Sequence, residues 1–157
     1  MKTEPRKEHE WLEKFAGEWT MEADSAAPDQ SQGEWTETGR AIGGGWVVLE
    51  GGGPMPDGNP ATTIMTLGYD SHRERYVGTW LGSMMDHLWV YEGTLEGNVL
   101  TLDTEGPTME KDAPRKLVKY KDVMEFKSDD HRVLTSHKQG EDGEWTVFMT
   151  AGYRRKR

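Results

Sequence analysis

The sequence contains no cysteine, which excludes disulfide bonds, thiolate metal sites and a cysteine nucleophile. It has no apolar run of membrane-spanning length, and its first residues lack the apolar stretch of a secretory signal. We therefore expect a cytoplasmic protein that does not contact a membrane. In that compartment the absence of cysteine is ordinary.

Basic residues are in the minority, because 19 Lys and Arg stand against 28 Asp and Glu and the formal charge is -9. This balance argues against nucleic acid as a partner, since phosphates attract a basic surface. Only 34% of the residues are hydrophobic, but seven Trp and five Tyr can each bury a large area. A single domain over residues 1–157 is the expected organisation.

Helical periodicity is confined to one short segment. Trp11, Leu12 and Phe15 recur on one helical face, which predicts a helix over about residues 9–15 that ends before Gly17. Beyond it, runs rich in Val, Thr, Trp and Tyr alternate with turn signals. The predicted strands are 19–23, 33–42, 46–50, 62–69, 75–83, 87–95, 99–104, 115–127, 132–139 and 144–154. Ten strands without intervening helices predict an all-β, closed antiparallel barrel with a short N-terminal helix.

The alternation of residues predicts which side chains point into this barrel, because a slip of one position reverses every one of them. On strand 115–127 the inward face includes Tyr120, Asp122 and Met124. A tight turn after that strand places His137 directly opposite Asp122. The next hairpin pairs His137 with Val147 and turns Met149 inward, opposite Thr135.

The middle of the chain gives a second set of cross-strand pairs. Trp80 is predicted opposite Trp89, Gly78 opposite Tyr91 and Gly82 opposite His87, so that large residues face small ones. These inward side chains could form a ligand cage, or they could simply fill the barrel. The residues predicted to bind a ligand are Tyr76, Trp80, His87, Trp89, Tyr91, Tyr120, Met124 and Met149.

Asp122 and His137 are the candidate catalytic residues. A carboxylate that holds an imidazole in one tautomer is a general-base arrangement, with His137 as the base and Asp122 as its orienting partner. We expect the pair to raise the pKa of His137. The alternative is a buried hydrogen-bonded pair that fixes the strand register. His87 could join them around a metal, but no ligand spacing supports this, and we predict neither a metal nor a cofactor.

Gly17-Glu18-Trp19, directly after the short helix, resembles the Gly-X-Trp signature of lipocalins. That resemblance implies that Trp19 closes one end of the barrel, with an arginine of the last strand stacked across it. Alternation favours Arg155 as this arginine.

The whole chain also resembles a bacterial family, domain of unknown function 1579. The resemblance lies in the stretches at residues 9–12, 17–19, 65–70, 78–80, 88–93, 103–107 and 153–155. It implies a lipocalin-like (calycin) barrel and brings no established activity. The distantly similar nitrobindins bind haem, but no stretch of this chain reproduces their haem-binding motif.

Three hypotheses about function remain open at this point. The barrel could bind a small hydrophobic or amphipathic molecule in its interior. It could be an enzyme that uses the same pocket, with His137 and Asp122 as its acid–base pair. It could also have a filled interior and an outer surface that serves oligomerisation, for example as a homodimer.

Overall fold

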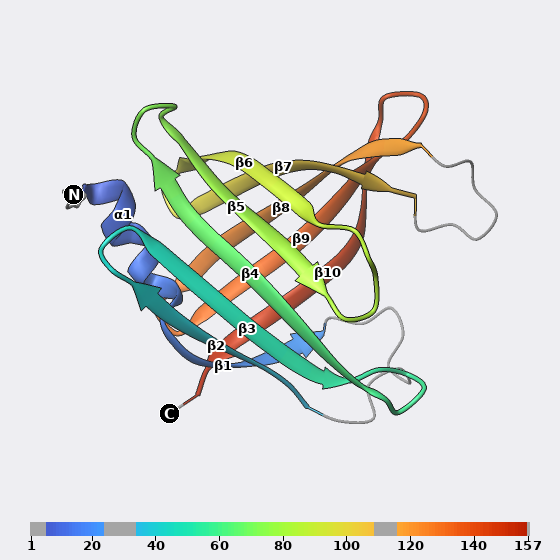
Figure 1. Cartoon of the computed structure of the whole chain (residues 1–157), viewed down its shortest axis with the longest axis horizontal. Coiled ribbons are helices and arrows are strands. Elements are labelled where there is room, and N and C mark those ends of the chain that lie inside the picture. Colours follow the sequence, from blue (N-terminus) through green and yellow to red (C-terminus); the bar gives the residue numbers. More distant parts are fainter. Residues whose placement is uncertain (1–5, 24–33, 109–115, 157) are drawn as a thin grey trace.

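The computed structural model describes residues 6–23, 34–108 and 116–156. Its ten strands form the predicted closed antiparallel barrel, in which each strand pairs with its sequence neighbours and β1 closes against β10 (Figure 1). The helix α1 (Lys7–Leu12) and the single turn η1 (Glu13–Phe15) precede the barrel. The strands are β1 (Gly17–Ala23), β2 (Trp35–Ile42), β3 (Trp46–Pro54), β4 (Pro60–Asp70), β5 (Arg75–Gly82), β6 (Trp89–Glu96), β7 (Val99–Pro107), β8 (Leu117–Ser128), β9 (His131–Gln139) and β10 (Trp145–Arg155).

Helix α1 lies across one end of the barrel and closes it (Figure 1). Two anchors hold it there: His9 Nε2 is 3.0 Å from the carbonyl of Tyr69, and the Tyr76 hydroxyl donates to the carbonyl of Glu8. Beneath it, Phe15 and Trp19 are fully buried. We call the part of the barrel next to α1 the capped half. Its fully or almost fully buried apolar side chains are Leu12, Phe15, Trp19, Val47, Leu49, Leu67, Leu100 and Leu102.

The other end of the barrel has no helix across it among the described residues, and we call it the open half (Figure 1). It is formed by the last residues of β1, β3, β5, β7 and β9 and by the first residues of β2, β4, β6, β8 and β10. Several aromatic and sulfur-containing side chains of this half retain accessible surface. Phe148 and Met149, at the start of β10, are 54% and 38% exposed. The same strands are thus densely packed at one end and less so at the other.

The predicted end of the barrel at Trp19 is confirmed. Trp19 is fully buried in the capped half, and the Arg155 guanidinium lies over its ring at 4.3 Å from the centroid. Trp19 is also paired with Arg155 across β1 and β10. The arginine donates to the carbonyls of Ala16 and Lys14, so it ties the last strand to the end of the helical segment.

The predicted opposition of Asp122 and His137 is wrong. The register between β8 and β9 shifts between Phe126 and Ser128, so that Asp122 faces Ser136 and His137 faces Lys121. A bulge places two residues of one strand opposite one of its partner, and it therefore moves all later pairs by one position. The buried side chains of β9 are consequently Arg132, Leu134 and Ser136 rather than their neighbours.

A second shift lies in the last hairpin, between Val147 and Met149. The predicted pair of Val147 and His137 is confirmed, but both residues belong to the outer face, and Val147 is 55% exposed. Met149 faces Ser136 instead of Thr135. After the second shift Met149 is on the inward face, as expected, and Tyr153 further along the strand is buried in the barrel.

The predicted pairs in the middle of the chain are mostly confirmed. Trp80 faces Trp89, and Gly78 faces Tyr91. The predicted pair of Gly82 and His87 is wrong, because the ladder between β5 and β6 ends at Trp80 and Trp89. The chain leaves the sheet over residues 83–88, and Gly82 pairs with Thr63 of β4.

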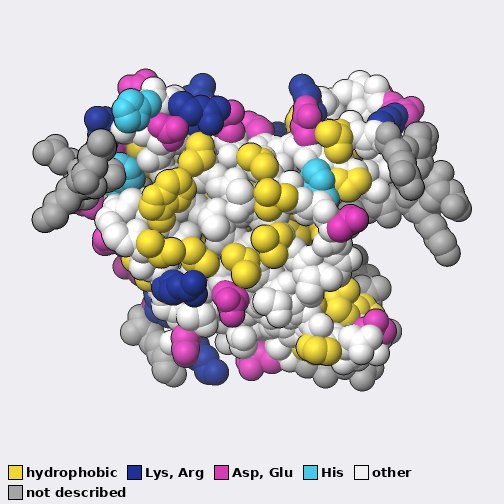
Figure 2. Space-filling model, viewed as in Figure 1, with side chains coloured by type: hydrophobic (Ala, Val, Ile, Leu, Met, Phe, Trp, Pro, Cys, Tyr) yellow, Lys and Arg dark blue, Asp and Glu magenta, His cyan; other side chains and the backbone are white. Residues whose placement is uncertain are grey.

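The outer face of β3, β4, β5 and β6 carries a row of uncharged side chains. Val48, Thr66, Thr79 and Val90 follow one another across the four strands. Hydrophobic side chains lie in the middle of this face in Figure 2, with charged ones around them.

No helix in the described part of the chain is long and apolar enough to cross a membrane.

Candidate functional site

Three polar side chains from three strands meet inside the barrel: the carboxylate of Asp122 on β8 and the hydroxyls of Tyr91 and Ser136, which both bond to it. The Tyr91 hydroxyl on β6 donates a hydrogen bond to Asp122 Oδ2 at 2.5 Å. The Ser136 hydroxyl on β9 donates to Asp122 Oδ1 at 2.7 Å. We name these residues the carboxylate cluster. They lie midway along the barrel, where the open half begins, because Asp122 and Ser136 face each other near the centres of β8 and β9.

Burial dominates the electrostatics of the carboxylate cluster. It raises the pKa of Asp122 above the ordinary 3.8, while the bonds from Tyr91 and Ser136 act in the opposite direction. The pKa of Tyr91 is raised well above 10.0, first by burial and then by the charge of Asp122. Tyr91 is therefore a neutral donor at neutral pH. Asp122 takes up a proton more readily than a carboxyl group in water.

A guanidinium lies deeper in the barrel, on the side of the capped half. Arg132 is almost completely buried and forms an ion pair with Glu37 of β2. Its guanidinium lies 4.0 Å from the ring centroid of Tyr153 and 4.7 Å from that of Trp19. Burial also raises the pKa of Tyr153, so its hydroxyl stays neutral. The charge of Arg132 is thus matched by Glu37 and enclosed by rings.

A series of four rings in edge-to-face contact lies in the open half, with the buried Trp89 and Tyr120 between the rim residue His87 and the exposed Phe148. The ring of His87 contacts Trp89, Trp89 contacts Tyr120, and Tyr120 contacts Phe148, with centroids 4.7, 5.1 and 5.9 Å apart. All three contacts are edge-to-face, an attractive arrangement of ring quadrupoles. The Tyr120 hydroxyl donates to the carbonyl of Pro107 at 2.6 Å, which fixes the ring against β7. These rings give the open half an apolar wall.

A cleft of about 770 Å³ opens beside this wall, between β6 and β7. The two strands pair only as far as Glu92 and Asp103, and no further ladder pair joins them in the described residues towards the open end. Tyr91, Thr104 and Tyr120 line the cleft from the barrel interior. The hydroxyl of Thr104 is buried there without a hydrogen-bond partner in the described part of the chain. The cleft thus reaches from the surface to side chains of the interior.

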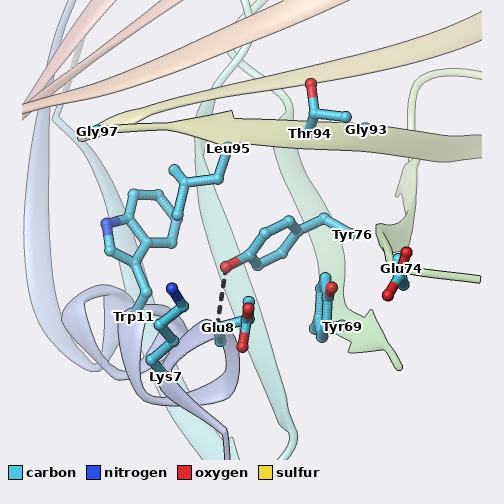
Figure 3. A pocket seen from close by; sticks show the side chains of 10 residues that line it. All are labelled: Lys7, Glu8, Trp11, Tyr69, Glu74, Tyr76, Gly93, Thr94, Leu95 and Gly97. Atoms are coloured by element: carbon cyan, nitrogen blue, oxygen red, sulfur yellow. Dashed lines mark hydrogen bonds between the residues drawn. The ribbon is translucent and has the colours of Figure 1, made fainter. Parts of the chain in front are cut away.

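A second pocket, of about 510 Å³, lies at the capped end between α1 and strands β4 to β6 (Figure 3). Tyr76 and Trp11 point into it from opposite sides, and the Tyr76 hydroxyl is already bonded to the Glu8 carbonyl. Lys7 and Glu74 lie at its edge (Figure 3). It holds no convergent polar group comparable to the carboxylate cluster, so we place the candidate site in the open half.

The structure divides the predicted ligand-binding residues between the two halves. Trp80, Trp89, Tyr91 and Tyr120 come together in the open half, and Met149 lies opposite Ser136 near its rim. Met124 and Tyr76 instead belong to the packed core of the capped half. His87 lies half-buried at the rim, with Nε2 3.1 Å from the carbonyl of Glu105.

The expectation of a catalytic His137 is not supported by the geometry. His137 belongs to the outer face of β9, opposite Lys121. Its pKa is lowered, first by burial and then by Lys121, and the charge of Asp122 only opposes this. The expected rise in the pKa of His137 is therefore wrong. No group of three or more potential metal ligands occurs among the described residues.

Sequence reasoning missed Ser136, Arg132 and Glu37 as interior residues. The alternation of Arg132, Leu134 and Ser136 contains only one apolar side chain, and the competing set of Val133 and Thr135 looks at least as apolar. Phe148 was also missed, because it occupies the irregular position between Val147 and Met149. A local bulge leaves no clear mark in a single sequence, so only the partner strands could have revealed these residues.

Comparison with known proteins places the chain in a family. The family model described as "Protein of unknown function (DUF1579)" matches residues 4–155. Comparison with curated proteins finds no match. One similar solved structure is described as "Structure of EF1p2_mFAP2b bound to DFHBI", with a TM-score of 0.47, 11% identity, and coverage of 95% of this chain and 99% of that one. Since the family model spans nearly the whole chain, the protein belongs to the DUF1579 family.

Proposed function

We propose that the open half of the barrel binds one small, partly apolar molecule. The apolar part of this molecule packs against Trp89, Tyr120 and Phe148, and its polar group reaches the carboxylate cluster. The observation that carries the proposal is the buried carboxylate of Asp122, which accepts hydrogen bonds from Ser136 and from Tyr91. Of these residues, Tyr91 lines the cleft that reaches the surface.

Packing energetics support this proposal. A buried polar group costs stability unless it is hydrogen-bonded, and a barrel with no ligand to bind would be filled at lower cost by apolar side chains. The capped half does this, with fully buried Leu100 and Leu102 on β7. Further along the same strand, Thr104 keeps a buried hydroxyl without a partner in the described residues. A ligand's donor or acceptor would satisfy such a group.

The test is to block the open half with one substitution. Thr104→Trp would place an indole in the interior, whereas Thr101→Trp adds the same side chain on the outer face of β7, where Thr101 pairs with Val123. Binding of the neutral dye Nile red is measured by fluorescence for both variants and the unchanged protein. Thr104→Trp should weaken binding at least about tenfold and Thr101→Trp should leave it unchanged. Equal binding by all three would overturn the proposal.

One observation favours a second candidate function, general acid–base catalysis by Asp122. A carboxyl group whose pKa is raised by burial, and which contacts a tyrosine hydroxyl, holds its proton to a higher pH than a carboxyl group in water and can act as an acid or a base. In this version Asp122 takes the role that the sequence suggested for His137. Native mass spectrometry of protein from its own host would identify a retained molecule. If Asp122 catalyses, Asp122→Asn would still bind that molecule but would no longer convert it.

A further inference from the structure

We infer that the molecule bound in the open half carries a protonated nitrogen, which pairs with Asp122. This inference rests on the proposed function and adds the charge of the ligand to it. It states that the barrel selects amphipathic cations and rejects amphipathic anions such as fatty acids.

The balance of charge inside the barrel is the first argument. Among the described residues, the charged side chains of Glu37, Asp122 and Arg132 lie inside the barrel. Lys138 follows Ser136 on the same face of β9, opposite Tyr120 and nearer the open end. Arg132 pairs with Glu37, and rings of Tyr153 and Trp19 cover its guanidinium. In the described part of the chain, Asp122 accepts hydrogen bonds from the hydroxyls of Tyr91 and Ser136 and forms no ion pair.

Two groups of the described residues donate hydrogen bonds to Asp122, and their lack of charge is the second argument. Both are neutral hydroxyls, those of Tyr91 and Ser136, and each bonds a different carboxylate oxygen. They supply dipoles but no opposite charge, and a buried carboxylate is stabilised most by a cation in contact with it. An anionic ligand would place a second negative charge beside Asp122. It would also find the guanidinium of Arg132 already paired with Glu37.

The walls of the open half are the third argument. Trp89, Tyr120 and Phe148 contact one another edge-to-face in the open half, and aromatic faces attract cations as well as apolar groups. The net charge of -9 acts in the same direction over a longer range, since it raises the local concentration of cations near the protein. The site thus combines a carboxylate, aromatic walls and a negative field.

Three probes that share one naphthalene ring test this inference by isothermal titration calorimetry at neutral pH. Naphthylmethylamine is a cation, naphthylmethanol is neutral and naphthoate is an anion. We expect the amine to bind the unchanged protein at least about tenfold more tightly than the alcohol, because both can donate a hydrogen bond to Asp122 but only the ammonium adds the attraction of an opposite charge. Naphthoate should bind more weakly than the alcohol.

Asp122→Asn then removes the charge and keeps the shape. Its amide oxygen can still accept a hydrogen bond from Tyr91 or Ser136, so the alcohol should lose less affinity than the amine, and the preference for the amine should disappear. Glu125→Gln is the matched control, because Glu125 lies on the same strand but on the outer face, in an ion pair with Lys127. This control should keep the full preference for the amine.

The outcomes separate the two proposals. If the alcohol binds and Thr104→Trp blocks it, but the amine binds no more tightly, the inference about charge is overturned and the proposed function stands. If naphthoate binds most tightly of the three probes, the inference about charge is likewise overturned. If none of the three probes binds, both proposals are overturned. The ranking on the unchanged protein needs no variant, so it decides the matter even if Asp122→Asn fails to fold.

Discussion

The capped and open halves of the barrel are built from the same ten strands and differ in how they use the interior. In the capped half, Phe15 is 0% exposed and joins a cluster of rings with Trp11 and Phe126. In the open half, Phe148 is 54% exposed, and polar groups such as Ser136 are buried beside Asp122. The capped half is filled by apolar side chains, whereas the open half encloses polar side chains that are hydrogen-bonded to one another.

This difference shows how a small barrel can separate stability from binding. The capped half buries apolar surface and fixes the strands through α1 and Arg155, so we expect stability to depend more on this half than on the open half. A rigid scaffold then holds the carboxylate cluster on three strands rather than on loops, which favours a precise geometry. We expect substitutions in the two halves to separate accordingly.

The largest expected contrast is between two identical substitutions at opposite ends. Phe15→Ala should lower the free energy of unfolding by ~3–5 kcal/mol, because it leaves a cavity under the helix. Phe148→Ala should cost less than about 1 kcal/mol, since that ring is largely exposed. Urea unfolding of both variants measures the difference. Similar losses at the two positions would show that the open half is as much a core as the capped half.

Gly78 lies where the two halves meet, between Leu67 of β4 and Tyr91 of β6. A side chain here would collide with the carbonyl of Thr66. Gly78→Val should therefore cost ~1–3 kcal/mol, the usual range for overpacking. Thr79→Val, one residue along on the outer face, should cost less, although it loses the bond to the Thr66 hydroxyl. Thermal unfolding of both variants checks this order, and the reverse order would mean that the inward face of β5 is misassigned.

Two neighbouring arginines at the end of β10 give a smaller contrast. Arg155 stacks on Trp19 and donates to the carbonyls of Ala16 and Lys14, whereas Arg154 only approaches Glu22 at the exposed surface. Arg155→Ala should cost ~1–2 kcal/mol. Arg154→Ala should change stability by less than about 0.5 kcal/mol. Comparing the two melting temperatures tests whether the capped end depends on this contact, and equal values would show that it does not.

The same contrast explains what the sequence could predict. The strands, the helix and the pairs of Trp80 with Trp89 and Gly78 with Tyr91 follow from local alternation and turn residues, and the structure confirms them. The burial of Trp19 under Arg155 follows from the lipocalin-like motif. These features depend on patterns within single strands or on short turns, which a sequence displays directly.

The carboxylate cluster could be predicted only in part. Asp122 and Tyr91 were placed inward correctly, but the bulge between Phe126 and Ser128 exchanged His137 for Ser136 as the partner of Asp122. The bulge at residues 126–128 contains no glycine, which would have marked one common type of bulge, so the sequence gives no local sign of it. Because the second shift in β10 cancels the first, Arg155 was still assigned correctly.

Asp122→Asn should give the smallest effect, and one that depends on pH. Burial raises the folded-state pKa of Asp122 above the ordinary 3.8, so the folded protein binds this proton more tightly than the unfolded chain. The resulting stability is present below the unfolded pKa and is lost as pH rises through the folded pKa, by about 1.4 kcal/mol per unit of separation. At neutral pH the asparagine variant, which has no charge to bury, should therefore be the more stable protein, and the difference should vanish below about pH 4. Urea unfolding of both proteins between pH 3 and pH 7.5, with Glu125→Gln as the control, measures this. If the difference in the free energy of unfolding stays constant over that range, burying the charge of Asp122 does not lower the stability of the protein.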